Sequence, residues 1–127
     1  MTLQAMFIMN VMRANRWHNS INDWNALEWA GAMCGEAGEA ANAAKKLKRV
    51  EDGLANINEE ARSLTTLEAA KLEVMKECAD TILYALLLMA RVGCQNAHDV
   101  LADVFNKKSI EYGFPERFHK EKRNDEQ

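Results

Sequence analysis

Two short acidic motifs stand far apart in the sequence. Glu36 and Glu39 are three residues apart, and so are Glu77 and Asp80. In a helix, side chains at this spacing lie on one face, so each motif predicts two carboxylates that point the same way. If the two faces pack together, four carboxylates converge, and protons or metal ions must relieve their repulsion.

A site of this kind would bind a hard cation. Oxygen ligands favour Mg²⁺, with Mn²⁺ as the alternative, over zinc or copper. Such sites suit phosphate chemistry, because the ion neutralises phosphate oxygens and activates a water molecule. We predict that Glu36, Glu39, Glu77 and Asp80 are both metal ligands and catalytic residues. Either motif alone is also typical of a solvated helix face. Whether Glu73, one turn before Glu77, is a further ligand stays open.

The neighbours of the acids support a site. Asp80 adjoins an apolar segment, residues 81–90, and a carboxylate at the edge of a buried segment needs a cation. Gly35 and Gly38 each cost a helix about 1 kcal/mol relative to alanine. We therefore expect that the acids require either a close backbone approach or free space at these glycines.

Six further residues are candidate substrate contacts. Tyr84 and Arg91 follow Asp80 on roughly the same helix face, although Tyr84 also fits a core position and Arg91 a cation at a helix end. Lys108 would donate to phosphate oxygens or face solvent. Aromatic rings near the start of the chain would stack on a nucleobase, unless they anchor the core. The predicted substrate-binding residues are Trp17, His18, Trp24, Tyr84, Arg91 and Lys108.

Four helices must position these residues. Apolar spacing and capping residues predict helices from Leu3 to Trp17, from Trp24 to Arg49, from Thr65 to Gly93 and from Asn96 to Gly113. Asp23 is the expected cap of the second helix, and Thr65 with Glu68 forms a capping box for the third. A turn at Ser20–Asp23 and a polar linker at Leu54–Ser63 separate them. We expect one helical domain, residues 1–118, and a frayed tail, residues 119–127.

The composition fits one all-α domain. The chain has 127 residues, 48% of them hydrophobic, and a single proline. The net charge of −3 is too small to indicate a partner, but the basic residues are scattered among acids, so the sequence predicts no nucleic-acid-binding stripe. Three cysteines without a CxxC pair indicate neither a disulfide framework nor a zinc site, which suggests a cytoplasmic protein.

The apolar segment 81–90 bears on membranes and on assembly. It is about half as long as a membrane span, and residues 1–12 do not resemble a signal peptide, so we expect no membrane association. The segment is apolar nearly all round, which predicts burial on every side. Three shorter helices can hardly surround it. We therefore expect a homodimer or homotetramer that completes the bundle core, with a monomer as the alternative.

The stretches GEAGEAANAAKK and KLEVMKECADTILYALLLMARVG resemble the MazG-like, all-α nucleoside triphosphate pyrophosphohydrolases. The resemblance covers roughly Trp24–Phe118. It implies that the ExxE and ExxD motifs bind magnesium and that water attacks the α-phosphorus, which yields a nucleoside monophosphate and pyrophosphate. Tyr84 and Arg91 stand at spacings seen in dCTP-hydrolysing relatives. Thr81 and residues 113–118 depart from the family pattern, which leaves the base and the sugar undetermined.

Three rival interpretations differ in chemistry. A di-iron bundle needs two Glu-x-x-His pairs, and in the sequence only Glu116 with His119 qualifies. A non-catalytic helical dimerisation or regulatory module would use the same fold without turnover. A phosphoribosyl-ATP pyrophosphohydrolase would use the same reaction on another substrate.

Overall fold

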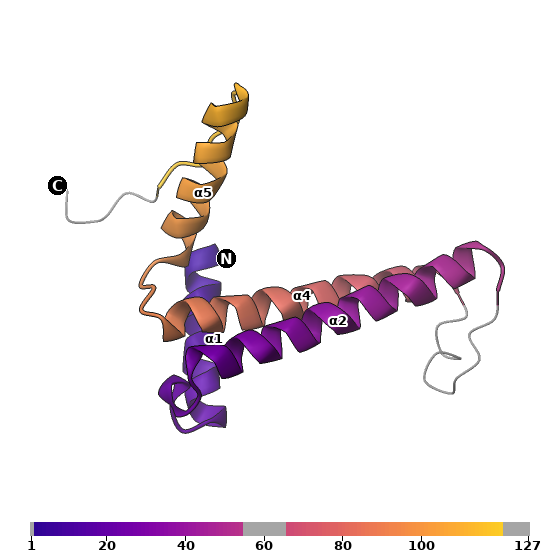
Figure 1. Cartoon of the computed structure of the whole chain (residues 1–127), viewed down its shortest axis with the longest axis horizontal. Helices are drawn as coiled ribbons and strands as arrows, with labels where there is room; N and C mark the ends of the chain where they lie inside the picture. Colours follow the sequence, from indigo (N-terminus) through magenta and orange to yellow (C-terminus); the bar gives the residue numbers. More distant parts are fainter. Residues whose placement is uncertain (1, 55–65, 121–127) are drawn as a thin grey trace.

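A computed structural model describes residues 2–54 and 66–120 of the chain (Figure 1). Within these residues it contains helices and no β-strand, which confirms the all-α prediction. The elements are α1 (Leu3–Trp17), the short 3₁₀ helix η1 (Ile21–Asp23), α2 (Ala26–Glu51), α4 (Leu67–Arg91) and α5 (Ala97–Tyr112). Thr65, most of the expected linker and residues 121–127 of the expected tail lie outside the described residues.

The two longest helices, α2 and α4, lie side by side as a hairpin (Figure 1). α1 crosses the end of this hairpin where α2 begins and α4 ends, and α5 extends away from the same end. Gln4 joins α1 to the start of α5, because its Oε1 accepts from Ala97 N at 2.9 Å and its Nε2 donates to Gln95 O at 2.9 Å. Because α2 and α4 pack side by side, their acidic residues face each other along the hairpin.

The start of α2 differs from the prediction. The cap is Asn25, whose Oδ1 accepts from Glu28 N at 2.8 Å while the Glu28 side chain accepts from Asn25 N. Asp23, the expected cap, belongs to the preceding turn, where its carboxylate accepts from Ser20 N at 3.3 Å. Two capping boxes follow one another here, and the second one starts the helix.

The other helix ends follow from their capping residues. α4 begins after Thr66, whose Oγ1 accepts from Ala69 N at 3.1 Å, so the prediction that Thr65 with Glu68 caps this helix is wrong by one residue. α5 begins after Asn96, as predicted. It ends at Gly113, whose φ of 72° is the left-handed conformation that glycine adopts without strain. Local side-chain hydrogen bonds thus set where these helices start.

The core is concentrated where α1 crosses the hairpin. One buried cluster joins α1, α4 and α5, and a second joins α1, α2 and α4. Their members are Phe7, Leu86 and Ala97 in the first and Ala14, Trp29 and Leu87 in the second. Further along the hairpin the buried apolar residues are small, Ala43 and Ala70, which lets α2 and α4 pack closely.

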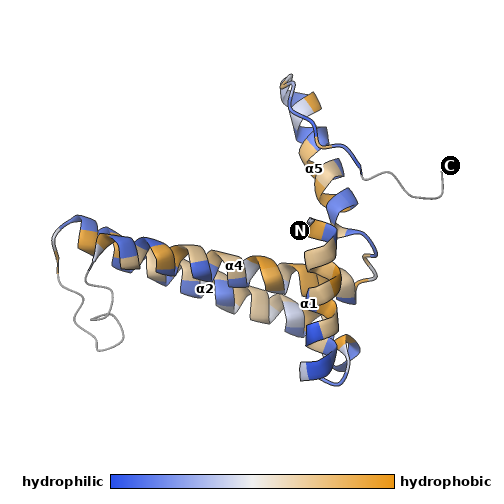
Figure 2. Ribbon diagram, turned by 180° about the vertical axis from the view of Figure 1, so that it is seen from behind, coloured by the Kyte–Doolittle hydropathy of each residue, from blue (hydrophilic) through white to orange (hydrophobic). Residues whose placement is uncertain are grey.

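A single chain does not bury the segment 81–90 on every side. Leu86 and Leu87 are buried, but Ile82 is 57% exposed. Exposed apolar side chains also cover one side of α1, where Met9 is 58% and Met12 52% exposed. Figure 2 shows the apolar part of α4 at the end of the hairpin beside α1. Burial of this surface by another copy stays a prediction.

The chain after α5 folds back along that helix. Asn106 and Phe118 exchange two hydrogen bonds of 2.8 Å between the Asn106 side chain and the Phe118 backbone. Lys120 Nζ lies 3.2 Å from a carboxylate oxygen of Asp103. The first residues of the expected tail therefore contact α5. Among the described residues, no helix has both the length and the apolar character needed to cross a membrane.

Candidate metal centre and adjoining pocket

Three of the four predicted ligands meet between α2 and α4. One carboxylate oxygen from each of Glu36, Glu39 and Glu77 lies within 4.8 Å of the other two. Oxygens bound to opposite sides of one Mg²⁺ are roughly 4.2 Å apart, since each lies about 2.1 Å from the ion. Small side-chain rotations would therefore bring all three onto one cation, and the all-oxygen donor set fits magnesium or manganese.

Glu77 occupies the most unusual position of the three. Its Oε2 is buried and accepts no hydrogen bond from any donor among the described residues. Burial raises the pKa of the Glu77 carboxyl, and the nearby carboxylates of Glu73 and Glu39 raise this pKa further. Two facing carboxylates can share a hydrogen bond only if one of them holds a proton. This position therefore needs either a proton or a cation.

Glu36 and Asp80 extend the acidic site toward α1. Partial burial raises the pKa of Glu36, and repulsion from Glu39 and then from Asp80 adds to this rise. Asp80 itself is exposed. The argument that Asp80 needs a cation because it is buried is therefore wrong. Of the two acids of the second motif, Glu77 is the one whose carboxylate meets those of Glu36 and Glu39.

The acidic site has no neutralising partner within the described chain. No ion pair joins Glu36, Glu39, Glu77 or Asp80 to a described lysine, arginine or histidine. Glu73 is different, because Lys76 Nζ lies 3.3 Å from one of its oxygens. Uncompensated carboxylates this close together attract a cation from solution.

A pocket of about 290 Å³ lies next to the acids, where α1 faces the hairpin. Its lining includes Glu36 and Asp80 and also three predicted substrate contacts, Trp17, His18 and Tyr84. The volume is close to the lower limit for sites that bind small molecules. The structure thus brings an aromatic surface and two of the acids into one cavity.

The aromatic residues near η1 fall into two groups. Trp29 is fully buried, and its Nε1 donates to Ile21 O at 2.9 Å. Trp24 packs on Trp29 with ring centroids 4.6 Å apart, so its ring belongs to this aromatic cluster. Trp17 is 74% exposed at the edge of the pocket, and His18 lies between Trp17 and Trp24. Trp17 is therefore the ring with a free face.

Three predicted substrate contacts do not line this pocket: Trp24, Arg91 and Lys108. Arg91 Nε donates to the main-chain oxygen of Trp24 at 2.7 Å, so its guanidinium holds the chain just before α2. Lys108 lies on α5 in an apolar hollow with Phe105 and Phe118. Within the single chain, neither of these cations lines the pocket that contains Glu36 and Asp80.

The glycines beside the acids face open space. A methyl group added at Gly35 or at Gly38 would meet no other side chain or neighbouring backbone within 4 Å. A close backbone approach by any of the residues that the structure describes is therefore excluded as their reason. Free space next to the acids, the other expectation, agrees with the structure.

Two residues of the pocket were missed from the sequence. Asn10 and Arg13 of α1 line it together with Trp17. A usable signal was present, because Asn10 interrupts the apolar face of α1 at a position where a hydrophobic residue would be expected. Arg13 follows one turn later on the same side of the helix.

Comparison with family models, curated proteins and solved structures gave no match to this chain. The resemblance to the MazG-like pyrophosphohydrolases therefore rests on the two acidic motifs and their neighbours alone.

Proposed function

We propose that the chain is a magnesium-dependent nucleoside triphosphate pyrophosphohydrolase of the MazG-like class, which converts an NTP or dNTP into the monophosphate and pyrophosphate. One observation carries this proposal: Glu36, Glu39 and Glu77 converge across the α2–α4 hairpin, and one Glu77 oxygen is buried without a donor. A solvated acidic face would not bury a carboxylate among other carboxylates, because this costs free energy without a compensating partner.

The residues of the site divide into two sets. Glu36, Glu39 and Glu77 would hold Mg²⁺ or Mn²⁺, and Asp80, close to Glu36, offers a further oxygen. When bound, the ion neutralises phosphate oxygens and makes a water molecule a stronger nucleophile. Trp17 and His18 line the same pocket and would provide ring faces for the base. This arrangement suits a substrate with an aromatic base at one end and phosphates at the other.

We also infer that a second copy of the chain covers the exposed apolar side of α1. Met9 and Met12 are each more than half exposed, and contiguous apolar surface of this kind is typical of protein interfaces. Such an interface would complete the bundle core as a homodimer or homotetramer. It would also place elements of another chain near the pocket that α1 forms.

A non-catalytic helical dimerisation module is the second candidate. The observation that favours it is the same exposed apolar surface on α1, together with the position of Arg91 and Lys108 outside the pocket. A module of this kind would assemble in the same way but would hydrolyse no nucleotide. Turnover therefore separates the two candidates.

The test is pyrophosphate release from a panel of canonical and modified nucleoside triphosphates, with phosphoribosyl-ATP included. The reactions contain Mg²⁺ and are repeated with a chelator. Glu77→Gln removes one ligand charge from the centre, and Glu111→Gln is the matched control, because Glu111 is an exposed acid on α5. We expect magnesium-dependent release in the wild type and the control and at least a 100-fold loss in Glu77→Gln.

Two outcomes would count against the enzyme. If the wild type released no pyrophosphate from any substrate of the panel, the dimerisation module would be favoured. Full activity of Glu77→Gln would show that the carboxylate cluster is not the catalytic centre, even if the chain hydrolyses nucleotides.

A further inference from the structure

Arg13 holds a distinctive place in the pocket. Among the described residues it is the only arginine or lysine in the pocket lining, which also includes Glu36 and Asp80. Even so, Arg13 forms no ion pair with any described acid. Because the Arg13 guanidinium is not paired with these carboxylates, it can donate hydrogen bonds to a ligand that carries negative charge.

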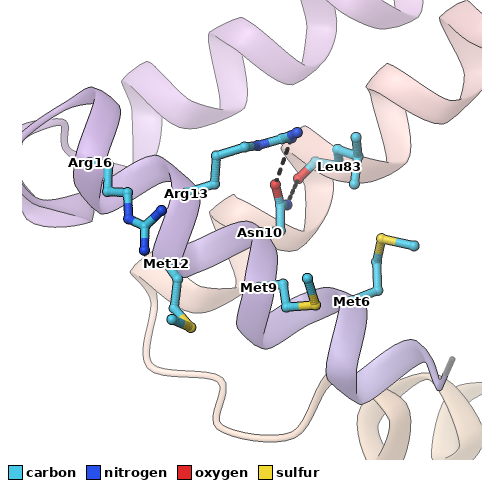
Figure 3. A pocket seen from close by; sticks show the side chains of 7 residues that line it. All are labelled: Met6, Met9, Asn10, Met12, Arg13, Arg16 and Leu83. Atoms are coloured by element: carbon cyan, nitrogen blue, oxygen red, sulfur yellow. Dashed lines mark hydrogen bonds between the residues drawn. The ribbon is translucent and has the colours of Figure 1, made fainter.

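The Arg13 side chain is oriented by a buried amide. Asn10 is only 5% exposed. Its Nδ2 donates to the main-chain oxygen of Leu83 on α4 at 2.8 Å, and its Oδ1 accepts from Arg13 Nη2 at 3.3 Å. Figure 3 shows the Arg13 side chain extended toward Asn10 and Leu83. Because α4 fixes the amide, the amide in turn fixes the guanidinium at the α1–α4 crossing.

The next arginine along α1 provides a contrast. Arg16 lines a separate, mainly apolar hollow of about 400 Å³ with Met6, Met9 and Met12, and it is not part of the acid-containing pocket. Arg13 borders both cavities. Arg13 and Arg16 thus carry the same charge, lie on the same helix and are both exposed, but only Arg13 lines the pocket that contains Glu36 and Asp80.

The order of side chains along α1 indicates which part of a nucleotide Arg13 would meet. Asn10, Arg13 and Trp17 lie along one side of α1 at helical spacing. Arg13 is therefore placed between the Asn10–Leu83 crossing and the exposed ring of Trp17. A phosphate bound by Arg13 would lie beside the nucleoside and still face Glu36 and Asp80.

We propose that Arg13 binds the 5′-phosphate group that is attached to the sugar of the substrate, and that Asn10 is the positioning residue that holds the guanidinium for this contact. The inference rests on the proposed function, and it names the part of the substrate that α1 recognises. Arginine suits this role, because its planar fork can donate two parallel hydrogen bonds to one phosphate group.

Binding calorimetry with the α,β-methylene analogue of a nucleoside triphosphate and Mg²⁺ tests the contact directly. The full-length chain is compared with Arg13→Ala, Arg13→Lys and the matched control Arg16→Ala. We expect an affinity loss of about 10- to 100-fold for Arg13→Ala, a smaller loss for Arg13→Lys and less than a twofold change for Arg16→Ala. Equal affinities for Arg13→Ala and Arg16→Ala would overturn the proposal.

A double-mutant cycle tests the positioning role of Asn10. Asn10→Leu keeps the size of the side chain on an apolar face, and Asn10→Ser is a second variant should Leu not fold. If Asn10 acts through Arg13, the double variant with Arg13→Ala binds no more weakly than Arg13→Ala alone. Additive losses would show that Asn10 serves only the packing of α1 on α4, and would refute its positioning role.

The failures of the two proposals are distinguishable. Hydrolysis by the wild type with unchanged kinetics in Arg13→Ala would refute the role of Arg13 and leave the enzyme intact. Binding without hydrolysis, lost in Arg13→Ala, would refute the enzyme and support Arg13. If the wild type neither bound nor hydrolysed a nucleotide, both proposals would be refuted. A change in molar mass with unchanged affinity would assign Arg13 to a subunit interface and overturn its phosphate contact.

Discussion

The Nε of Arg91, in the last turn of α4, donates to the main-chain oxygen of Trp24 at 2.7 Å. This bond links the end of one hairpin helix to the chain just before the other, next to the aromatic cluster around Trp29. A cation at this position also interacts favourably with the C-terminal end of α4. A residue predicted to bind substrate is thus a structural link between helices.

Arg91→Ala should lower the free energy of unfolding by about 1.5–3 kcal/mol, since a hydrogen bond from a charged group is lost. Urea denaturation followed by circular dichroism measures this change. Lys107→Ala, which removes an exposed cation from α5, serves as the control and should change stability by less than about 0.5 kcal/mol. Equal stability of the two variants would show that the Arg91–Trp24 bond contributes nothing.

Glu77→Gln should stabilise the metal-free protein. The glutamine amide can donate to the carboxylates of Glu39 and Glu73, which replaces repulsion by hydrogen bonds. We expect a gain of about 1 kcal/mol, or roughly 4 °C in melting temperature for a domain of this size. Scanning calorimetry in chelator measures it, with Glu111→Gln as the unchanged control. A lower melting temperature would contradict the idea that Glu77 is a strained ligand.

Magnesium should reverse the order of the melting temperatures of the wild type and Glu77→Gln. Mg²⁺ in excess raises the melting temperature of the wild type, because it binds the folded form only. The same addition should leave Glu77→Gln almost unchanged, since the variant has lost one ligand charge. A rise of equal size in both proteins would indicate that the ion acts elsewhere on the molecule.

The stability of the metal-free protein should depend on pH in a defined direction. The pKa values of Glu36 and Glu77 are raised above the usual value of 4.5. The folded state therefore binds more protons than the unfolded state just above pH 4.5, and these groups stabilise the fold fully only below that pH. Their contribution is lost as pH rises through the folded-state pKa values. Melting curves of Glu36→Gln and wild type in chelator, from pH 4 to 8, should diverge with the variant more stable at neutral pH.

Gly38→Ala should separate stability from activity. Alanine stabilises a helix interior by about 1 kcal/mol relative to glycine, and a methyl group here meets open space within the chain. We therefore expect a more stable protein. If the open space receives substrate or another copy, turnover falls in the same variant. Gly31→Ala, also free of contacts and further from the acids, is the matched comparison and should gain stability while keeping activity.

Met9→Glu should weaken self-association, because it places a charge in the apolar surface of α1. Sedimentation equilibrium compares it with Gln95→Glu, which adds the same charge at an exposed position between α4 and α5. A wild type that sediments as a monomer would refute the homo-oligomer, and an unchanged mass for Met9→Glu would place the interface elsewhere.

Local sequence patterns predicted which segments form helices, but not every residue at which a helix starts. Asn96 caps α5 as predicted, through a side-chain bond to the third residue on, whereas α4 is capped in the same way by Thr66 and not by Thr65. The start of α2 was predicted wrongly at Asp23, because Ser20 and Asn25 each head a capping box within six residues. The first box starts the short helix η1 and takes Asp23 as its acid, and the second starts α2.

The site depends on contacts that spacing cannot reveal. The i, i+3 rule correctly put Glu36 beside Glu39, but it could not reveal that one Glu77 oxygen is buried while Asp80 is exposed, because this depends on how α4 packs. Arg13 was missed because it comes from a third helix, whose crossing is fixed by the bond from Asn10 to Leu83. Spacing along one helix says nothing about such a crossing.

Because the tryptophans differ in burial, their intrinsic fluorescence can report on ligand binding and on unfolding. Trp29 is fully buried in the core, whereas Trp17 is 74% exposed at the mouth of the pocket. A water-soluble quencher reaches Trp17 in the folded protein and reaches Trp29 only after unfolding. Emission from the intact chain can therefore distinguish a nucleotide that shields Trp17 from a change that opens the core, without any attached dye.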